Sequence, residues 1–348
     1  MISPIAILAL QLAYATPVQG DFKIPNFRFA SGETLPQLNL HYRTVGKLQR
    51  DAKGNATNAV LILHGTTGTG GAFLGSRFGN QLFDAGQALD SEKYFLILPD
   101  GIGHGQSSKP SDGLHAKFPA YTYGDMVEAQ HRLVTEGLKV NHLRLVLGTS
   151  MGAMHAWMWG ERWPGMVDAL MPLASAPVQI AGRNRMMRRL ISTSIRNDPE
   201  WNNGEYTKPP RGLDGALEML FIMTSSPLHE HQDAPTRDEA DQSMDSWMAR
   251  ERRVVDANDM LYAFESSRDY NPSPDLEKIQ AHVYAVNSAD DEVNPPELGI
   301  MEREIKRVKH GRYILIPTGP DTHGHGTHSR PEVWGKYLEE LLAVSQIR

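Results

Sequence analysis

The chain has 348 residues, of which 40% are hydrophobic and 22% are charged, a composition that excludes collagen-like, coiled-coil and wholly disordered proteins. It contains no cysteine, which excludes disulfide scaffolds, iron–sulfur clusters and a cysteine nucleophile. The 35 Lys and Arg residues against 41 Asp and Glu residues give a net charge of −6, and an acidic chain without a basic tail is a poor nucleic-acid binder. No apolar stretch approaches the roughly 20 residues that span a bilayer, so we expect no transmembrane segment.

The first 20 residues allow two interpretations. Met1–Ala15 is almost entirely apolar and ends in Ala13-Tyr14-Ala15, which resembles the end of a secretory signal peptide. The first basic residue is Lys23, however, so the positive segment that usually precedes such a stretch is missing. The alternative is a short apolar arm packed on the domain. A leader predicts a periplasmic or secreted protein, and an arm predicts a cytoplasmic one.

Seven short runs along the chain are predicted to be strands. They are Leu38–Thr44, Ala59–His64, Tyr94–Pro99, Leu143–Leu147, Ala169–Leu173, His282–Asn287 and Tyr313–Pro317. Most of them are continuously apolar, as strands covered on both faces are, so the inner sheet is predicted to be parallel. Helical patterns lie between them at Tyr123–Gly137, Met151–Trp163, Pro296–Lys309 and Pro331–Val344. This alternation predicts an α/β fold with a mostly parallel, doubly wound sheet.

The alternation stops between about residues 178 and 274. This stretch contains several prolines and helical patterns at Leu213–Met223 and Asp238–Asp256, but no run that resembles a strand. We therefore expect a helical insertion at 178–274 in a core formed by 21–177 and 275–348. Insertions of this kind commonly form lids over sites at the carboxyl ends of the strands.

Gly148-Thr149-Ser150-Met151-Gly152 follows a predicted strand and opens a predicted helix. This is the G-x-S-x-G nucleophile elbow in the context that it requires. Glycine at 148 and 152 avoids collisions in a very tight turn, which would expose Ser150 beside a helix N-terminus. There the helix dipole and free amides favour a developing oxyanion.

A serine nucleophile needs a base and an orienting carboxylate, which in this type of fold follow in the order Ser, Asp or Glu, His. Asp290, Asp291 and Glu292 come directly after one predicted strand, and His323, His325 and His328 come after the next. We choose Asp291 as the acid, because Asp291 to Pro295 fits the Asp-x-x-x-Pro start of a following helix. We choose His325 as the base, because it follows Gly324 as in the Gly-His pair of hydrolases.

Two other patterns offer alternatives. The cluster Asp321-x-His323-x-His325-x-x-His328 is dense enough to hold a divalent metal ion, although the triad order already explains one of its histidines. The glycine-rich loop His64–Gly71 fails as a phosphate-binding loop because no Lys-Ser or Lys-Thr follows it. That loop more naturally supplies the N–H of Thr66, which with the N–H of Met151 would form an oxyanion hole. We therefore expect no metal and no cofactor.

The insertion is rich in methionine and arginine, and its arginines allow two interpretations. Arg183, Arg185, Arg188 and Arg189 usually would form a solvated face, but they could also bind an anionic group of a substrate. No individual substrate-binding residue can be assigned from this pattern.

From about Asp21 to the C-terminal helix, the sequence resembles the α/β-hydrolase superfamily, in its homoserine O-acetyltransferase-like branch. Besides the elbow, the segments Ile195–Trp201, Gly204–Tyr206 and Asp256–Tyr262 are similar to segments of that branch. The resemblance implies a helical lid and often a homodimer formed through it. It also implies an arginine and, seven residues later, a tyrosine in the substrate site, but this chain has Leu217 and Thr224 there.

These observations together predict a serine hydrolase that cleaves a small carboxylic ester through an acyl-enzyme on Ser150, with His325 as base and Asp291 orienting it. The main alternative is a homoserine O-acyltransferase that uses acetyl-CoA. A metal-dependent hydrolase and a non-catalytic binding protein on the same fold are further alternatives.

Overall fold

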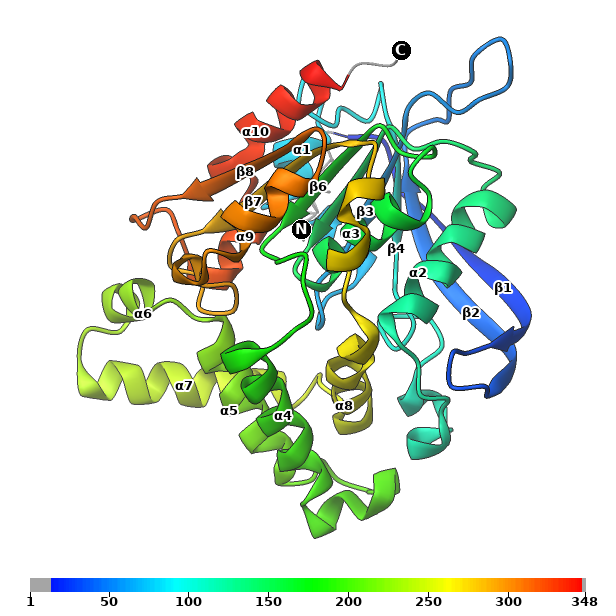
Figure 1. The fold of residues 1–348 in the computed structure, drawn as a ribbon. Helices are drawn as coiled ribbons and strands as arrows, with labels where there is room; N and C mark the ends of the chain where they lie inside the picture. The colour runs from blue at the N-terminus through cyan, green and yellow to red at the C-terminus, as the bar shows by residue number, and fades with distance from the viewer. Residues whose placement is uncertain (1–13, 346–348) are drawn as a thin grey trace, which may run out of the picture.

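The structure is a computed structural model and describes residues 14–345 (Figure 1). Its centre is an eight-stranded sheet with the order β1-β2-β4-β3-β5-β6-β7-β8. The strands are β1 (Val18–Arg28), β2 (Thr34–Val45), β3 (Ala59–Leu63), β4 (Phe95–Pro99), β5 (Leu145–Thr149), β6 (Ala169–Leu173), β7 (His282–Ser288) and β8 (Gly311–Ile316). The β1–β2 and β2–β4 pairs are antiparallel and the other pairs are parallel, which confirms the predicted mostly parallel sheet.

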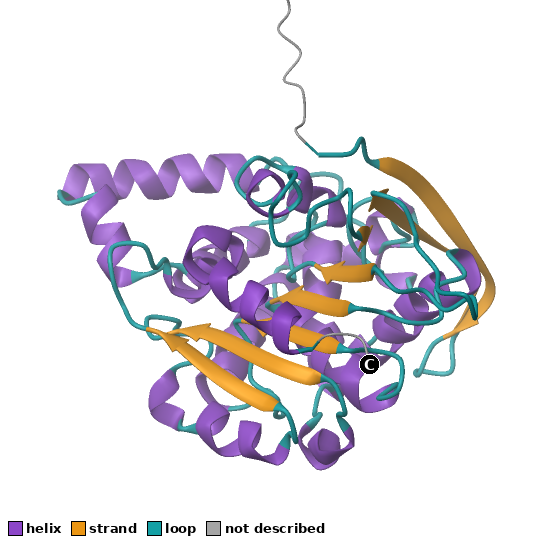
Figure 2. Cartoon of the chain, turned by 90° about the horizontal axis from the view of Figure 1, so that it is seen from above, coloured by secondary structure: helices purple, strands orange, loops and turns teal. Residues whose placement is uncertain are grey.

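Helices cover both faces of this sheet (Figure 2). The helices of the core are α1 (Gly79–Leu82), α2 (Tyr123–Arg132), α3 (Met151–Arg162), α9 (Ile300–Glu304) and α10 (Pro331–Val344). Side chains of a strand point alternately to the two faces. In β5, Val146 therefore joins the apolar cluster that contains α2 and α3 residues, while Leu145 and Leu147 join the cluster that contains α10 residues. Burial on both sides explains why the strand reads as a continuous apolar run.

Five helices form the insertion between β6 and β7. They are α4 (Gly182–Arg196), α5 (Gly212–Thr224), α6 (Pro227–Asp233), α7 (Arg237–Glu251) and α8 (Ala257–Glu265). Figure 1 shows them gathered beyond one end of the sheet. They bury an apolar cluster of their own, in which Ile191 and Ile195 of α4 pack with Leu213 and Leu217 of α5 and Leu261 of α8. The described residues between β6 and β7 form no strand, as the sequence predicted.

Several element boundaries differ from the sequence-based expectations. β1 was not predicted, because this edge strand pairs only with β2 and carries exposed polar residues among its apolar ones. The predicted helix Asp238–Asp256 ends at Glu251. Asp256 instead begins α8, because its carboxylate accepts hydrogen bonds from the backbone N–H groups of Asn258 and Asp259. The predicted helix Pro296–Lys309 is reduced to α9 with short 3-10 turns on either side.

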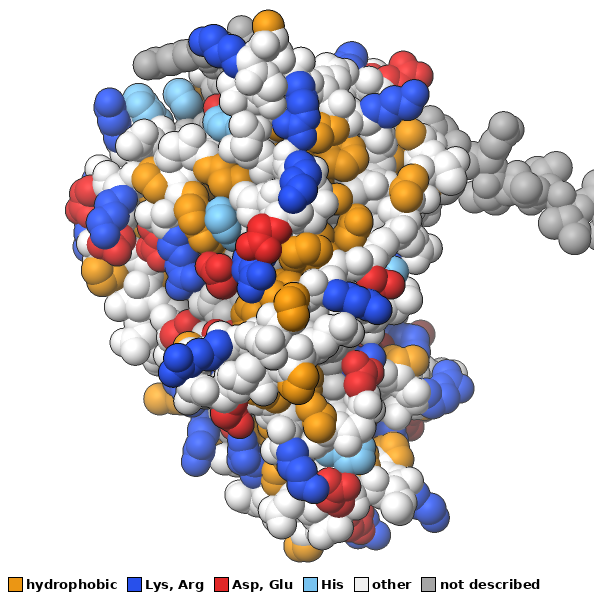
Figure 3. All heavy atoms as spheres, turned by 90° about the vertical axis from the view of Figure 1, so that its right-hand side faces the viewer, with side chains coloured by type: hydrophobic (Ala, Val, Ile, Leu, Met, Phe, Trp, Pro, Cys, Tyr) orange, Lys and Arg blue, Asp and Glu red, His pale blue; other side chains and the backbone are white. Residues whose placement is uncertain are grey.

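The predicted leader or arm, Met1–Ala15, lies outside the described residues except for its last two. Tyr14 is buried: its ring packs edge-on against Phe83, with 5.7 Å between ring centroids, and its hydroxyl donates to the Leu74 carbonyl at 2.5 Å. Within residues 14–345, no helix has both the length and the apolar character that crossing a membrane requires. Acidic and basic side chains are interspersed over the face shown in Figure 3.

Candidate active site

Ser150 sits in the turn that joins β5 to α3. Its φ of 53° and ψ of −112° lie in a region that non-glycine residues rarely adopt, as a strained nucleophile elbow requires. A Cβ on Gly148 would lie 2.0 Å from the Gly152 carbonyl oxygen, so the predicted collision across the turn is present. A Cβ on Gly152 would instead lie 2.1 Å from the carbonyl oxygen of Leu63. The second glycine is thus required by the neighbouring strand β3.

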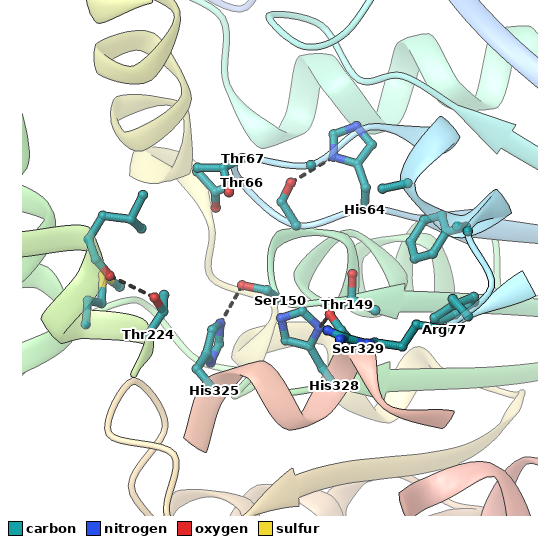
Figure 4. A pocket seen from close by; sticks show the side chains of 18 of the residues that line it. His64, Thr66, Thr67, Arg77, Thr149, Ser150, Thr224, His325, His328 and Ser329 are labelled. Atoms are coloured by element: carbon teal, nitrogen blue, oxygen red, sulfur yellow. Dashed lines mark hydrogen bonds between the residues drawn. The ribbon is translucent and has the colours of Figure 1, made fainter. Parts of the chain in front are cut away.

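Ser150, His325 and Asp291 form one hydrogen-bonded chain. The Ser150 Oγ lies 2.8 Å from the His325 Nε2, the hydrogen bond drawn as a dashed line in Figure 4, and the His325 Nδ1 lies 3.0 Å from the Asp291 Oδ2. All three side chains are buried. The three residues come from the carboxyl ends of β5, β8 and β7, which share one edge of the parallel sheet. The structure therefore brings together the three residues that the sequence motifs selected.

The Asp291 carboxylate is held by its own loop. Its Oδ1 accepts a hydrogen bond from the backbone N–H of Val293 at 2.8 Å, and its Oδ2 accepts one from the Asn294 side chain at 3.1 Å. Burial alone would raise the pKa of Asp291. The charge and hydrogen bond of His325 and the donors from Asn294 and Val293 outweigh burial and lower that pKa below its usual 3.8. Asp291 is therefore ionised at neutral pH, as the partner of a base should be.

The two rival acids have other partners. The Asp290 Oδ2 accepts hydrogen bonds from the Ser226 hydroxyl at 3.0 Å, the Thr322 hydroxyl at 3.0 Å and the Gly324 N–H at 2.8 Å. Asp290 thus ties the loop that carries His325 to the helical insertion. Glu292 forms a partly exposed ion pair with Arg183.

The rival histidines do not bond to Ser150. The His328 ring lies beside the His325 ring, with 5.2 Å between ring centroids, and the His328 Nδ1 lies 2.9 Å from the Ser329 hydroxyl oxygen. Burial, with the nearby His325 charge, lowers the pKa of His328 to about 3, so this ring is neutral. The His323 ring packs edge-on against the His229 ring of the insertion. In the part of the chain that the structure describes, no group of three or more metal-ligating side chains has an arrangement that could hold an ion.

Thr66 lies in the loop that follows β3, and Met151 directly follows Ser150 in the chain. Met151 is the first residue of α3, and the first N–H groups of a helix have no internal partner. Thr66 lines the cavity above Ser150 and lies opposite His325 (Figure 4). The oxyanion hole that the sequence predicts from these two amides stays a prediction.

His64 fixes the peptide that contains the Thr66 N–H. Its Nε2 accepts from the Gly101 N–H at 2.9 Å, so the proton resides on Nδ1, which donates to the Gly65 carbonyl at 2.8 Å. The Gly65 carbonyl also accepts from the Gly68 N–H at 2.9 Å. In a trans peptide the N–H points away from the carbonyl, so these bonds set the direction of the Thr66 N–H. Burial lowers the pKa of His64 to about 4, which keeps the ring neutral.

A cavity of about 310 Å³ opens at Ser150. The core contributes Thr66, Ser150 and His325 to its lining. The helical insertion contributes Arg188 from α4, Leu220, Met223 and Thr224 from α5, and Phe264 from α8. A substrate at Ser150 would therefore contact both the core and the insertion.

Two features of this site were not predicted from the sequence. The role of His64 depends on a hydrogen bond to a loop 37 residues away, which no local pattern reveals. The sequence did not show which of the four arginines in this segment, Arg188 among them, faces the cavity and which face solvent. A usable signal was present, however, because Arg188 shares a helical spacing of three and four residues with Ile191 and Ile195, which marks the buried face of α4.

Comparison with known proteins agrees with this architecture. The family model for the alpha/beta hydrolase fold matches residues 58–320. The chain is 32% identical over 278 residues to a "Probable acyltransferase" of Methanothermobacter thermautotrophicus, and the match covers 80% of this chain and 84% of that protein. It is 31% identical over 229 residues to a homoserine O-acetyltransferase of Natronomonas pharaonis, a match that spans 59% of this chain and 54% of that protein.

A solved acetylester hydrolase from Corynebacterium glutamicum has the same fold, with a TM-score of 0.79, 23% sequence identity and coverage of 94% of this chain and 96% of that one. The family match extends over most of the chain and includes the elbow and the loops that carry Asp291 and His64. The chain therefore belongs to the α/β-hydrolase family of enzymes, in its homoserine O-acetyltransferase-like branch.

Proposed function

We propose that this protein is a serine hydrolase that cleaves a small carboxylic ester through an acyl-enzyme on Ser150. The observation that carries the proposal is the hydrogen-bonded chain from Ser150 through His325 to Asp291 at a nucleophile elbow. Such a chain activates a hydroxyl that is otherwise a weak nucleophile at neutral pH.

The proposed reaction has two halves. His325 Nε2 takes the proton of the Ser150 hydroxyl as Oγ attacks the ester carbonyl, and the N–H groups of Thr66 and Met151 stabilise the resulting oxyanion. The tetrahedral intermediate expels the alcohol, which receives the proton from His325. Water then attacks the acyl-enzyme with His325 again as base, and the acid is released. The sum is ester plus water to carboxylic acid plus alcohol.

Residues 178–274 are proposed to act as a lid. Support comes from the cavity lining, since α4, α5 and α8 all contribute side chains to it. A hydrogen bond also supports the proposal: the Ser226 hydroxyl of the insertion donates to the carboxylate of Asp290, in the loop that carries Asp291.

Hydrolysis is favoured over acyl transfer by the residues on α5. The resemblance leads us to expect an arginine and a tyrosine in a homoserine site, and this chain has Leu217, which is buried in the insertion, and Thr224. Loss of a buried charge-assisted contact costs on the order of 2–5 kcal/mol. A homoserine O-acyltransferase is the second candidate, because matched relatives carry that name.

Labelling with a fluorophosphonate tests the nucleophile. Wild-type protein should be labelled and should release acid from a small ester, whereas Ser150→Ala should not be labelled and should lose about 10⁴-fold or more in turnover. His325→Ala should be as damaging, while His323→Ala should be mild and a chelator without effect. Ester turnover that survives Ser150→Ala would refute the proposal, and chelator-sensitive turnover would favour a metal-dependent mechanism.

Mass spectrometry of a mixture of protein, acetyl-CoA and homoserine tests the acceptor. The proposal predicts no O-acetylhomoserine. A strong product peak that disappears in Ser150→Ala would replace hydrolysis by acyl transfer while leaving the nucleophile in place.

A further inference from the structure

Arg188 is a buried arginine in the wall of the catalytic cavity. Its side chain is only 1% exposed, yet it lines the same cavity as Ser150. Its Nε donates to the Asn184 Oδ1 at 2.9 Å, its Nη1 lies 3.5 Å from the Ser267 Oγ, and its guanidinium carbon lies 5.5 Å from the centroid of the Phe264 ring. None of these partners is an anion, and Arg188 forms no ion pair with any residue in 14–345.

Other arginines of the insertion behave in the opposite way. The pairs are Arg183 with Glu292, Arg196 with Glu265 and Arg252 with Asp214, and all of these arginines are substantially exposed. An exposed ion pair contributes little to stability, whereas a buried charge without a counter-ion is costly. Arg188 is therefore the arginine that would gain most from a counter-ion, and the fold provides none for it.

The rest of the cavity has the same electrostatic bias. Its lining contains a second arginine, the exposed Arg77, and no Asp or Glu among the described residues. The chain as a whole has a net charge of −6, so this bias does not reflect the overall composition. A cavity with one sign of charge raises the local concentration of ligands with the opposite sign.

The guanidinium of Arg188 is also held in a fixed orientation. Asn184 and Ser267 engage Nε and Nη1, and Phe264 lies against the guanidinium. The Nη2 donates no hydrogen bond to any described residue. A planar guanidinium with a free amino group is suited to binding an oxygen of a carboxylate or a similarly compact anion.

We propose that Arg188 binds a carboxylate, or a similarly compact anion, on the substrate whose ester is cleaved at Ser150. The proposal rests on the esterase function proposed above and adds the chemical class of the substrate. The resemblance implied an arginine on α5, where this chain has Leu217. In the proposal, Arg188 of α4 supplies the cation of the insertion instead. The anion belongs either to the acyl group or to the alcohol, and both cases are tested.

The experiment uses esters that differ only in charge. Mono-ethyl succinate and ethyl butyrate place a carboxylate or a methyl group on the acyl side, and 3-acetoxypropanoate and propyl acetate make the same comparison on the alcohol side. Proton NMR follows acid release by wild type. We expect kcat/KM for the charged ester of one pair to exceed that of its neutral partner by about tenfold or more.

Variants then locate the anion site. Arg188→Met should reduce the charged-to-neutral ratio of kcat/KM by about 30-fold or more, mainly through KM, and Arg188→Lys should restore part of it. Arg189→Met is the matched control, because Arg189 lies next along α4 but is exposed. It should leave the ratio unchanged. The side of the ester whose ratio collapses in Arg188→Met identifies the portion that carries the anion.

The outcomes separate this inference from the proposed function. A wild type that cleaves the neutral esters as well as both charged ones overturns the anion site and leaves the esterase intact, and this result does not depend on the folding of any variant. If no ester is cleaved, calorimetric titration with succinate and with 3-hydroxypropanoate still decides. Binding of either that weakens in Arg188→Met supports the site, and absence of binding by wild type overturns it.

Discussion

Replacing Asp291 by asparagine removes the negative charge beside the base, His325, while preserving the shape of the side chain. In the transition state His325 becomes positively charged, and the Asp291 Oδ2 lies 3.0 Å from its Nδ1. At an effective dielectric constant of 20, the attraction between unit charges at this distance is about 5.5 kcal/mol. Since each 1.36 kcal/mol corresponds to a factor of ten in rate, we expect Asp291→Asn to lower kcat by about 10⁴-fold.

The hydrogen bonds of Asp291 point to the same result. Val293 and Asn294 donate to this carboxylate, as does the His325 Nδ1–H. An asparagine has only one acceptor oxygen, so its amide group would face a donor. The His325 ring would then favour the tautomer whose Nε2 carries the proton, and that nitrogen could not accept the proton of Ser150.

The matched control is Asp290→Asn on the same loop. Asp290 bonds to the Gly324 N–H and the Ser226 hydroxyl but not to His325, so its replacement should cost less than about tenfold in kcat. Steady-state kinetics on a small acetate ester, with thermal unfolding of each variant, measures both effects. If Asp291→Asn keeps more than a tenth of wild-type kcat, or if Asp290→Asn is the more damaging change, Asp291 is not the orienting acid.

A pH titration of stability provides a second measurement on Asp291. Its folded-state pKa is lowered, so its ionised form contributes stability above the unfolded-state pKa, near 3.8, and this contribution is lost as the pH falls through the folded-state value. Wild type should therefore be more stable than Asp291→Asn at neutral pH. The difference should shrink as the pH falls below about 4.

Two further predictions concern the loops beside Ser150. His64→Phe removes the donor that fixes the peptide of Thr66, so kcat should fall by about tenfold or more with KM little changed, and equal loss of binding would contradict a role in the oxyanion hole. Gly152→Ala places a Cβ 2.1 Å from the Leu63 carbonyl oxygen and should destabilise the fold by about 1–3 kcal/mol in denaturant unfolding, whereas Gly165→Ala, which meets no atom within 4 Å, should be neutral.

The parallel part of the sheet could be predicted because burial on both faces leaves a direct signal in the sequence. β3 reads Ala-Val-Leu-Ile-Leu and is buried at every position. β1 has no such signal: Ile24 and Phe27 are buried, but Asp21, Lys23 and Asn26 are not, and it joins the sheet only through β2. An edge strand is defined by its partner more than by its own residues.

The candidate site was predictable to a similar extent. Ser150, Asp291 and His325 each follow a strand and obey a fixed order along the chain, so motif and topology select them without coordinates. Arg188 and His64 depend on tertiary packing instead. Four arginines lie within seven residues of one helix, and in the folded chain Arg188 packs against Phe264 of α8. The direction of the Thr66 N–H depends likewise on a neighbour from another loop.

The long connection between β6 and β7 also affects how the molecule is made. β6 pairs with β5 on one side and with β7 on the other, and the whole insertion separates Leu173 from His282. At a synthesis rate of roughly 5–20 residues per second, β7 is synthesised about 5–20 s after β6. During that time the nascent chain presents an apolar strand with an open hydrogen-bonding edge, the feature through which incomplete proteins associate. Chaperones that cover an exposed strand during synthesis should therefore raise the yield of native protein.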